Sequence, residues 1–227
     1  MDEAISQLTE RAPAPRAVSL RRFDVTERVL HWVTALDVLT LIVTGAILYF
    51  PSFSVRVGQR LLIENIHTLS GILALVPLLV ALWGRWGAML RKDVTRLTRF
   101  DQREWRWFDR TRRMRLEIGK FNPGQKLNAI FSISGLVVLL GTGLVLRFPN
   151  PFSLSIRQGV TFVHDWFAFS VALLVFGHIG FALFHPRALW SMLSGRIDRL
   201  WAERHSPAWV REYDLEEERS QQERSLH

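Results

Sequence analysis

Four of the seven histidines in this sequence stand within or at the mouth of long apolar segments. They are His31, His67, His164 and His178. An ionisable side chain in a membrane span is costly unless it faces the bundle interior and finds a partner. Imidazole nitrogens bind iron, and two of them can hold a b-type haem from opposite sides. The four residues are therefore candidate axial ligands of haem iron.

Four apolar blocks must position these histidines, and each has about the 20 residues needed to cross a hydrocarbon core of about 30 Å. The blocks run from Val29 to Phe50, Ile66 to Trp83, Leu127 to Leu146 and Val160 to Phe184. Strands of a membrane barrel would be about half as long and would alternate in polarity, whereas a run such as GILALVPLLVALWG is apolar on every side. We predict an all-α integral membrane protein, a four-helix bundle.

Positive charge lies mostly on one side of these spans. Of the 29 Lys and Arg residues, 25 fall in the N-terminal tail, the central loop and the C-terminal tail. The positive-inside rule then places both termini and the central loop in the cytoplasm. Because this charge sets the topology, nucleic acid is not an expected partner. The opening MDEAISQLTE predicts no cleaved signal peptide.

Spacing and topology pair the histidines. Fourteen residues separate His164 from His178, so on a helix they share a face about 21 Å apart along the axis. The span order puts His67 at the depth of His164 near the outer face, and His31 at the depth of His178 near the cytoplasmic face. We predict two six-coordinate b haems, an outer one held by His67 and His164 and an inner one held by His31 and His178. Without cysteine, the chain cannot attach haem covalently or hold a thiolate-bound cluster.

Each histidine alone has another interpretation, a hydrogen-bonded polar residue, but four at matched depths argue against it. His185 is expected at the membrane interface, and His205 and His227 at the surface. Asp37 could carry protons or accept a hydrogen bond from a neighbouring span, with the structural role slightly favoured. Pro77 predicts a kink in the second span.

Glycines within the spans would let helices approach one another or a flat macrocycle closely. Each of them alone is more often a packing residue. They are Gly45, Gly71, Gly141, Gly143, Gly177 and Gly180.

The segment KFNPGQKLN precedes the third span, at the depth of the inner pair. A quinone needs hydrogen-bond donors for its carbonyls and a proton route to water, which Asn122, Gln125 and Lys126 could supply. The alternative is a helix N-cap with a basic flank, and the chemistry of the residues alone favours it.

The sequence predicts three regions. Residues 1–20 are expected to form a disordered cytoplasmic tail, residues 21–184 the four-helix di-haem domain, and residues 185–227 a cytoplasmic amphipathic helix and tail. The tail from Arg204 is expected to be ordered only in part, and we find no convincing internal repeat. Helical spacing predicts one interfacial helix through Leu189, Leu193, Ile197, Leu200 and Trp201.

In order and spacing, several segments resemble the cytochrome b (gamma) subunit of membrane-bound respiratory formate dehydrogenases. They are RRFDVTERVLHW, ENIHTLSG, WFDRTRR, KFNPGQK, VHDWFA, GHIGFALF and RALWSMLSGRIDRLWAERHSPAWVRE, and they cover nearly the whole chain. The resemblance implies haem ligation by His31, His67, His164 and His178. It also implies a quinone region at Asn122, Gly124, Gln125 and His178, where Pro123 departs from the commoner residue.

The same resemblance implies a multi-pass protein of the bacterial inner membrane with two partners. These are an iron–sulfur (beta) subunit and a molybdenum- or tungsten-containing catalytic (alpha) subunit, which carries the formate-oxidising site. Electrons would pass from the iron–sulfur subunit to the outer haem, the inner haem and then menaquinone or ubiquinone, so this chain needs no catalytic residue for formate.

Two other functions stay open. A cytochrome b subunit of a hydrogenase or thiosulfate reductase shares the four-helix plan. A proton or metal transporter, or a membrane anchor, would use the histidines without haem.

Overall fold

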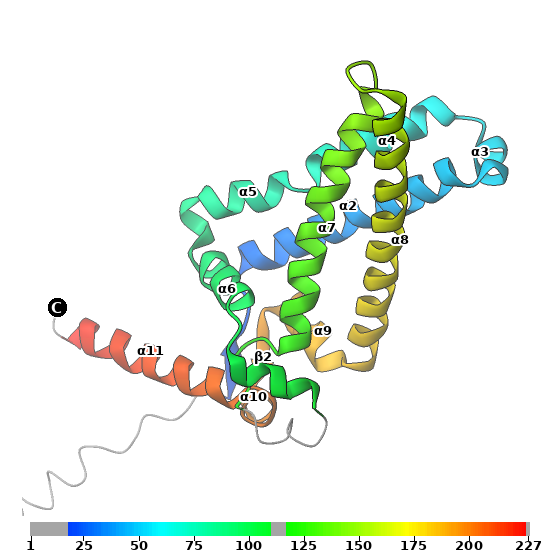
Figure 1. The fold of residues 1–227 in the computed structure, drawn as a ribbon. Coiled ribbons are helices and arrows are strands. Elements are labelled where there is room, and N and C mark those ends of the chain that lie inside the picture. Colours follow the sequence, from blue (N-terminus) through cyan, green and yellow to red (C-terminus); the bar gives the residue numbers. More distant parts are fainter. Residues whose placement is uncertain (1–17, 110–116, 226–227) are drawn as a thin grey trace, which may run out of the picture.

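The computed structural model describes residues 18–109 and 117–225. Four helical segments in it are long and apolar enough to cross a membrane (Figure 1). They are α2 (Val25–Tyr49), α4 (Arg60–Leu73) continued by α5 (Val76–Trp83), α7 (Pro123–Arg147) and α8 (Leu154–Phe184). The predicted all-α architecture with four spans is confirmed. Each span begins a few residues before its predicted apolar block, because a polar first turn extends the helix.

The second span is interrupted where the sequence predicts a kink. Helix α4 ends at Leu73, and α5 begins at Val76 with Pro77 in its first turn. Proline has no backbone N–H and its ring clashes with the preceding turn, so a continuous helix is disfavoured here. The predicted kink is thus a full break between two helices.

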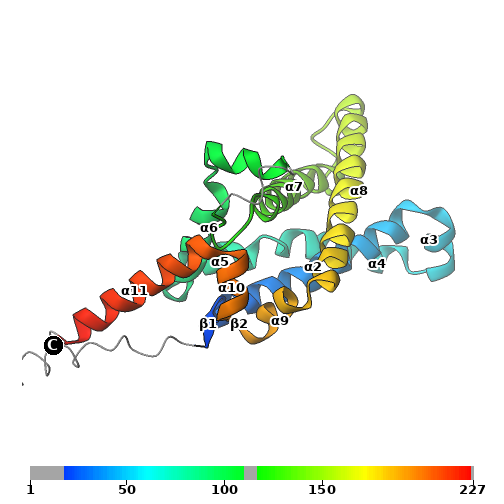
Figure 2. The ribbon, with the colours of Figure 1, turned by 90° about the horizontal axis from the view of Figure 1, so that it is seen from below.

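The four spans form two hairpins that cross one another. Helix α2 packs along α4, and α7 packs along α8, while α4 contacts α7 and α2 contacts α8. Figure 1 shows the α7–α8 hairpin running across the hairpin of α2 and α4, and Figure 2 shows the same crossing from below. The short helix α3 (Pro51–Val57) turns the chain from α2 into α4. The crossing brings side chains of different hairpins together.

The two hairpins begin in the same way, although the sequence contains no convincing internal repeat. Helices α2 and α7 are both 25 residues long, and α7 starts 98 residues after α2. Asp24 and Asn122 are their N-caps, and each forms a capping box with the residue three positions on, Glu27 and Gln125. The likeness of the two hairpins cannot be recognised from the sequence, because the matching residues are few and scattered along apolar segments of similar composition.

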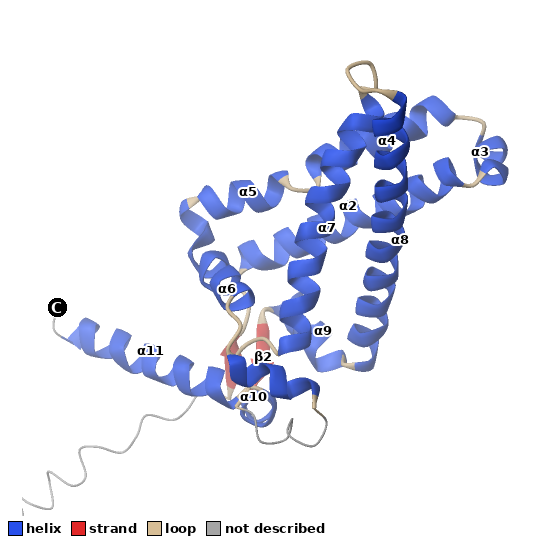
Figure 3. Ribbon diagram, in the orientation of Figure 1, coloured by secondary structure: helices blue, strands red, loops and turns tan. Residues whose placement is uncertain are grey.

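A small layer lies at the end of the hairpins where the described chain begins and ends. The strands β1 (Ser19–Arg21) and β2 (Arg196–Asp198) pair antiparallel, with Leu20 opposite Ile197. Helices α10 (Arg199–His205) and α11 (Pro207–Ser225) follow, and Leu20, Ile197, Ala202, Trp209 and Val210 form their buried core. We call these four elements the terminal layer. Figure 3 shows both strands within it.

The terminal layer corrects three sequence expectations. The predicted interfacial helix is broken into α9 (Pro186–Ser194), β2 and α10, because Gly195 takes a left-handed φ of 79° that ends α9. The predicted tail from Arg204 is helical as far as Ser225. Ser19 and Leu20, the end of the predicted disordered tail, pair as a strand, while residues 1–17 lie outside the described residues.

The central connection packs against both hairpins and the terminal layer. It contains η1 (Arg85–Gly87), α6 (Ala88–Thr98) and η2 (Gln102–Phe108). Asp93 on α6 forms an ion pair with Lys120, and both side chains are buried. Glu27 Oε1 lies 3.8 Å from Lys120 Nζ, and Arg96 Nη1 lies 2.7 Å from Asp93 Oδ1. These charges tie α2, α6 and the start of α7 together.

Candidate haem-binding site

Two pairs of histidines from different hairpins meet between the spans. The ring centres of His31 on α2 and His178 on α8 lie 6.3 Å apart. Those of His67 on α4 and His164 on α8 lie 6.4 Å apart. These are the two pairings that topology predicts, and each one joins the first hairpin to the second.

The separation within each pair suits one metal ion between two rings. With metal–imidazole bonds of about 2 Å, two rings on opposite sides of one iron have centres about 6 Å apart. Ligation by two histidines influences the reduction potential of a haem and leaves no open position on the iron. Both pairs therefore fit the axial ligand set of a b haem, and their role as ligands stays a prediction.

A threonine orients each histidine of the His67–His164 pair. The Oγ1 of Thr44 lies 2.9 Å from Nδ1 of His67, and the same hydroxyl donates to the carbonyl of Thr40 over 2.7 Å. Because the hydroxyl proton is used in that bond, its oxygen accepts from Nδ1–H of His67. The imidazole is then the tautomer with a free lone pair on Nε2, as a metal ligand requires.

The second hairpin repeats this arrangement. The Oγ1 of Thr142 lies 2.8 Å from Nδ1 of His164 and donates to the carbonyl of Val138 over 2.7 Å. A glycine follows each threonine, and a Cβ on Gly45 or Gly143 would lie 3.4 Å from Cε1 of the paired histidine. The glycines therefore leave space for the rings. Sequence reasoning found the glycines but missed Thr44 and Thr142; the Thr-Gly pair at matching positions of two spans was the available signal.

The inner pair is held differently. The ring of His31 meets Trp32 edge-on, with ring centres 5.3 Å apart. Among the described residues, neither His31 nor His178 has a hydrogen-bond partner for its ring nitrogens, in contrast to the outer pair. The inner imidazoles are therefore positioned by packing and by their helices.

The predicted quinone region lies at the start of α7. Asn122 Oδ1 accepts from the backbone N–H of Gln125, and Gln125 Oε1 accepts from that of Asn122, both over 2.9 Å. The N-cap interpretation is therefore correct, and the two side-chain NH₂ groups are the donors that could reach a quinone carbonyl. Gly124 leaves room for Trp107, since a Cβ there would lie 3.1 Å from the indole. Lys126 belongs to a partly buried ion pair, with Nζ 2.6 Å from Glu104 Oε1, so its ammonium group already has an acidic partner.

The other histidines of the described chain have local partners. His185 stacks on Phe181 with ring centres 4.0 Å apart, and His205 stacks on Trp201 at 4.2 Å. Neither faces another histidine. Within residues 18–109 and 117–225, no cluster of three or more His, Cys, Asp or Glu side chains could hold a metal ion. Histidine pairs are thus the metal-binding feature that this part of the chain offers.

The sequence profile of the family described as prokaryotic cytochrome b561 matches residues 22–195, which span all four helical segments and both histidine pairs. The chain belongs to that family. Cytochromes b bind haem b, so the family assignment agrees with the geometry of the pairs. It also identifies the four apolar helices as those of a bacterial membrane protein.

Cytochrome b subunits of formate dehydrogenases are among the relatives of this cytochrome, which confirms the resemblance. The "Formate dehydrogenase, cytochrome b556(fdo) subunit" of Escherichia coli K12 is 25% identical over 210 residues, covering 87% of this chain and 94% of the relative. The cytochrome b556 subunit of Haemophilus influenzae is 24% identical over 209 residues, covering 84% and 82%. The nitrate-inducible cytochrome b556(Fdn) subunit of E. coli K12 is 26% identical over 113 residues, or 48% and 52%.

Proposed function

We propose that this chain is the di-haem cytochrome b subunit of a respiratory formate dehydrogenase. It would pass electrons from an iron–sulfur subunit to membrane quinone. The single observation that carries the proposal is the meeting of two histidine pairs between crossed hairpins, at two levels of one membrane protein. The nearly full-length similarity to formate dehydrogenase cytochrome subunits supports the choice of complex.

Two b haems, once bound, would supply one-electron redox chemistry at two depths of the membrane. His67 and His164 hold the outer site, with Thr44 and Thr142 fixing the ring tautomers. His31 and His178 hold the inner site. On α8, the 14 residues between His164 and His178 correspond to about 21 Å of helix, so the two sites divide the membrane thickness.

Quinone reduction is proposed beside the inner site. His178, Gly124 and the NH₂ groups of Asn122 and Gln125 would form its region, at the end of the spans that carries both termini. The capping box supports this role because it fixes both amides in one position before a ligand arrives. Protons for the quinone would then come from the cytoplasm.

The orientation and partners belong to the same proposal. The concentration of Lys and Arg in the tails and central loop supports a cytoplasmic location for both termini. Residues 21–184 would form the haem-binding unit, and residues 185–227 would lie on the cytoplasmic side. The relatives are named as subunits of formate dehydrogenases, which supports an association with other subunits of such a complex. We propose that these are an iron–sulfur subunit and a molybdenum- or tungsten-containing subunit.

Haem content of the purified complex tests the central claim. The dithionite-reduced spectrum should show a b-type band at two haems per chain, and His178→Ala should lower this to one. His185→Ala is the matched control and should retain both, because its ring stacks on Phe181. A single haem in the unmodified protein would overturn the pairing, and unchanged haem in His178→Ala would favour a transporter or anchor.

Mass spectrometry of the copurifying subunits tests the choice of complex. A formate-oxidising subunit with an iron–sulfur subunit is the expected result. Hydrogenase or thiosulfate reductase subunits in their place would assign the chain to the other electron-transfer complexes with this four-helix plan.

A further inference from the structure

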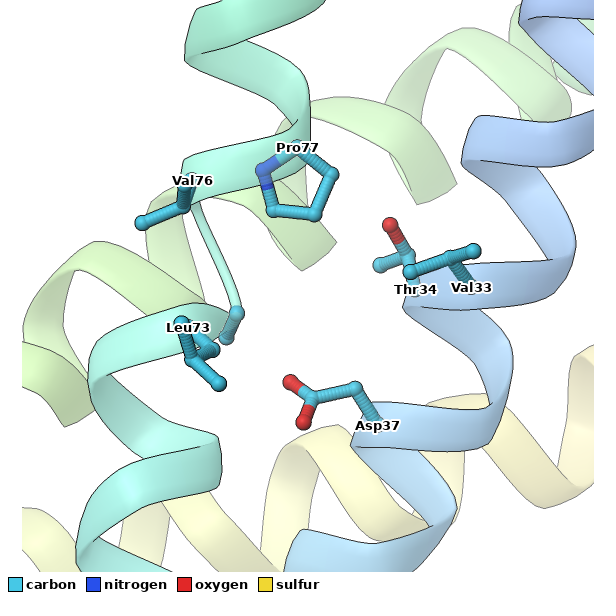
Figure 4. Close-up of a pocket in the computed structure, with 7 residues that line it drawn as sticks. Val33, Thr34, Asp37, Leu73, Val76 and Pro77 are labelled. Carbon is cyan, nitrogen blue, oxygen red and sulfur yellow. The ribbon is translucent and has the colours of Figure 1, made fainter.

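Asp37 is an acidic residue in the middle of α2, between the levels of the two histidine pairs. It lies six residues beyond His31 and seven before Thr44, which correspond to about 9 Å and about 10 Å along the helix. Figure 4 shows its carboxyl directed from α2 into the region where α4 passes into α5. An acid at this depth calls for a partner or a function.

The carboxyl is only half satisfied. Ser70 on α4 gives it one side-chain hydrogen bond, while Oδ2 is buried without a hydrogen-bond partner. Asp37 takes part in none of the ion pairs among the described residues. A structural hydrogen bond between α2 and α4 accounts for one oxygen and leaves the other unexplained.

A cavity of about 190 Å³ lies against this carboxyl. Its other lining residues are Val33, Thr34, Leu73, Ala74, Val76 and Pro77. Leu73 ends α4, and its carbonyl cannot receive the usual bond from residue 77, which is a proline without an N–H. An ordered water needs two to four polar partners. The Asp37 carboxyl, the Thr34 hydroxyl and the free carbonyl of Leu73 can provide them.

The second hairpin has no such feature at the corresponding place. Counted from the helix starts, Gly135 on α7 occupies the position of Asp37 on α2. A Cβ at Gly135 would lie 2.8 Å from Cγ2 of Val171, so α7 and α8 are tightly packed there. Helix α8 is also unbroken along its length. Acid, cavity and helix break therefore occur together in the first hairpin, whereas at the matching place in the second hairpin a glycine is closely packed against an unbroken helix.

Few other charges lie near the level of Asp37. On the elements packed against α2, the ionisable side chains nearest that level are the paired histidines on α4 and α8 and Asp165, which follows His164 on α8. Helix α5 has none, and the charged residues of η1 and α6 follow beyond the end of α5. An ionised carboxylate in such surroundings is costly, and its Coulomb interaction with a charge about 10 Å away is strong in a low dielectric. The charge of Asp37 is therefore most sensitive to the charge at the two histidine pairs.

We propose that the Asp37 carboxyl exchanges a proton with water in the cavity at the α4–α5 break when the haems change oxidation state. This inference rests on the proposed function. With haem bound, uptake of one electron from the iron–sulfur donor would remove one positive charge, and the Asp37 carboxylate would take one proton, supplied from the aqueous phase through the cavity water, to form its O–H bond. When the electron passes on to the quinone, Asp37 would release the proton to the water again. In this role Asp37 compensates the change of charge at the haems, and it does not contact the quinone.

Redox titration of the haems at several pH values tests the proposal in the purified complex. In the unmodified protein, the midpoint potential of at least one haem should fall as pH rises. Asp37→Asn should flatten that dependence at unchanged haem content, and Asp37→Glu should restore it. An unchanged pH dependence in Asp37→Asn would overturn the inference. Absence of haem from the unmodified protein would instead overturn the proposed function.

Infrared redox-difference spectra give a second measurement that does not require Asp37→Asn to fold. The reduced-minus-oxidised spectrum should contain a protonated-carboxyl C=O band that shifts in D₂O. Ser70→Ala keeps the acid but removes its hydrogen bond, and should move this band. A spectrum without the band, or a band that Ser70→Ala leaves in place, would contradict the proposal.

Discussion

The hydroxyl of Thr142 lies 2.8 Å from Nδ1 of His164, and both residues belong to the second hairpin. The first hairpin forms the same contact between Thr44 and His67. Each outer histidine is thus oriented by a threonine of its own hairpin. Each hairpin therefore contributes one histidine and the threonine that orients it to the outer site.

Removing one of these hydroxyls should lower the affinity of the outer site for haem and change the midpoint potential of that haem. In Thr44→Val the Nδ1–H of His67 loses its acceptor, so haem affinity should fall by about 10- to 100-fold. The outer midpoint potential should rise, because a less basic imidazole stabilises ferric iron less well. Haem titration and spectroelectrochemistry would measure both effects. Thr40→Val is the control, since the Thr40 hydroxyl bonds to the carbonyl of Leu36, and an equal effect there would refute the role of Thr44.

A side chain at Gly143 should displace the outer haem. A Cβ there would lie 3.4 Å from Cε1 of His164, and the further methyls of Gly143→Val would push the ring from its position. We expect the haem content of the purified chain to fall by about half. Gly141 is two residues away on the same helix and has open space around it, so Gly141→Val should retain both haems. Equal loss in the two variants would point to a general effect on the helix.

The buried ion pair between Asp93 and Lys120 should contribute strongly to stability. Asp93→Asn leaves the Lys120 ammonium buried, with Glu27 at 3.8 Å as its remaining acidic neighbour. Loss of one partner of a buried pair costs about 3–5 kcal/mol, so thermal unfolding in detergent should occur at a clearly lower temperature. Arg211→Gln breaks the exposed pair with Glu117 and should cost about 1 kcal/mol or less. A similar shift in both variants would argue against the burial effect.

Attachment of α11 to α6 should weaken in acid. Burial acts to raise the pKa of Glu212, but its hydrogen bond to Arg96 and that positive charge outweigh burial and hold the pKa below its ordinary value. A lowered carboxyl pKa contributes stability above the unfolded-state pKa, and the contribution is lost as pH falls through the folded-state pKa. The protection factors of the α11 amides, which are hydrogen-exchange rates corrected for the intrinsic effect of pH, should therefore fall on acidification. In Glu212→Gln the protection factors should already be lower at neutral pH and respond less to acid.

The spans and the pairing of the histidines could be predicted from the sequence. Both depend only on the length of the apolar blocks and the order in which the helices cross the membrane. It did not predict Thr44 as a hydrogen-bond partner, because this role depends on the rotation of α2 against α4. The cavity beside Asp37 likewise depends on how fully the helix breaks at Pro77. The amphipathic spacing from Leu189 to Trp201 predicted one helix, but the pairing of Leu20 with Ile197 overrode that local pattern.

The pairing of β1 with β2 has a consequence for the order of synthesis. Strand β1 is completed at Arg21, yet its partner begins at Arg196, after all four spans. Contacts between such distant segments form late because they close a long loop. Strand β1 therefore stays unpaired until all four spans have been synthesised. Closure of the terminal layer therefore follows synthesis of all four spans, and a chain truncated before residue 196 would leave Leu20 without Ile197 as its partner.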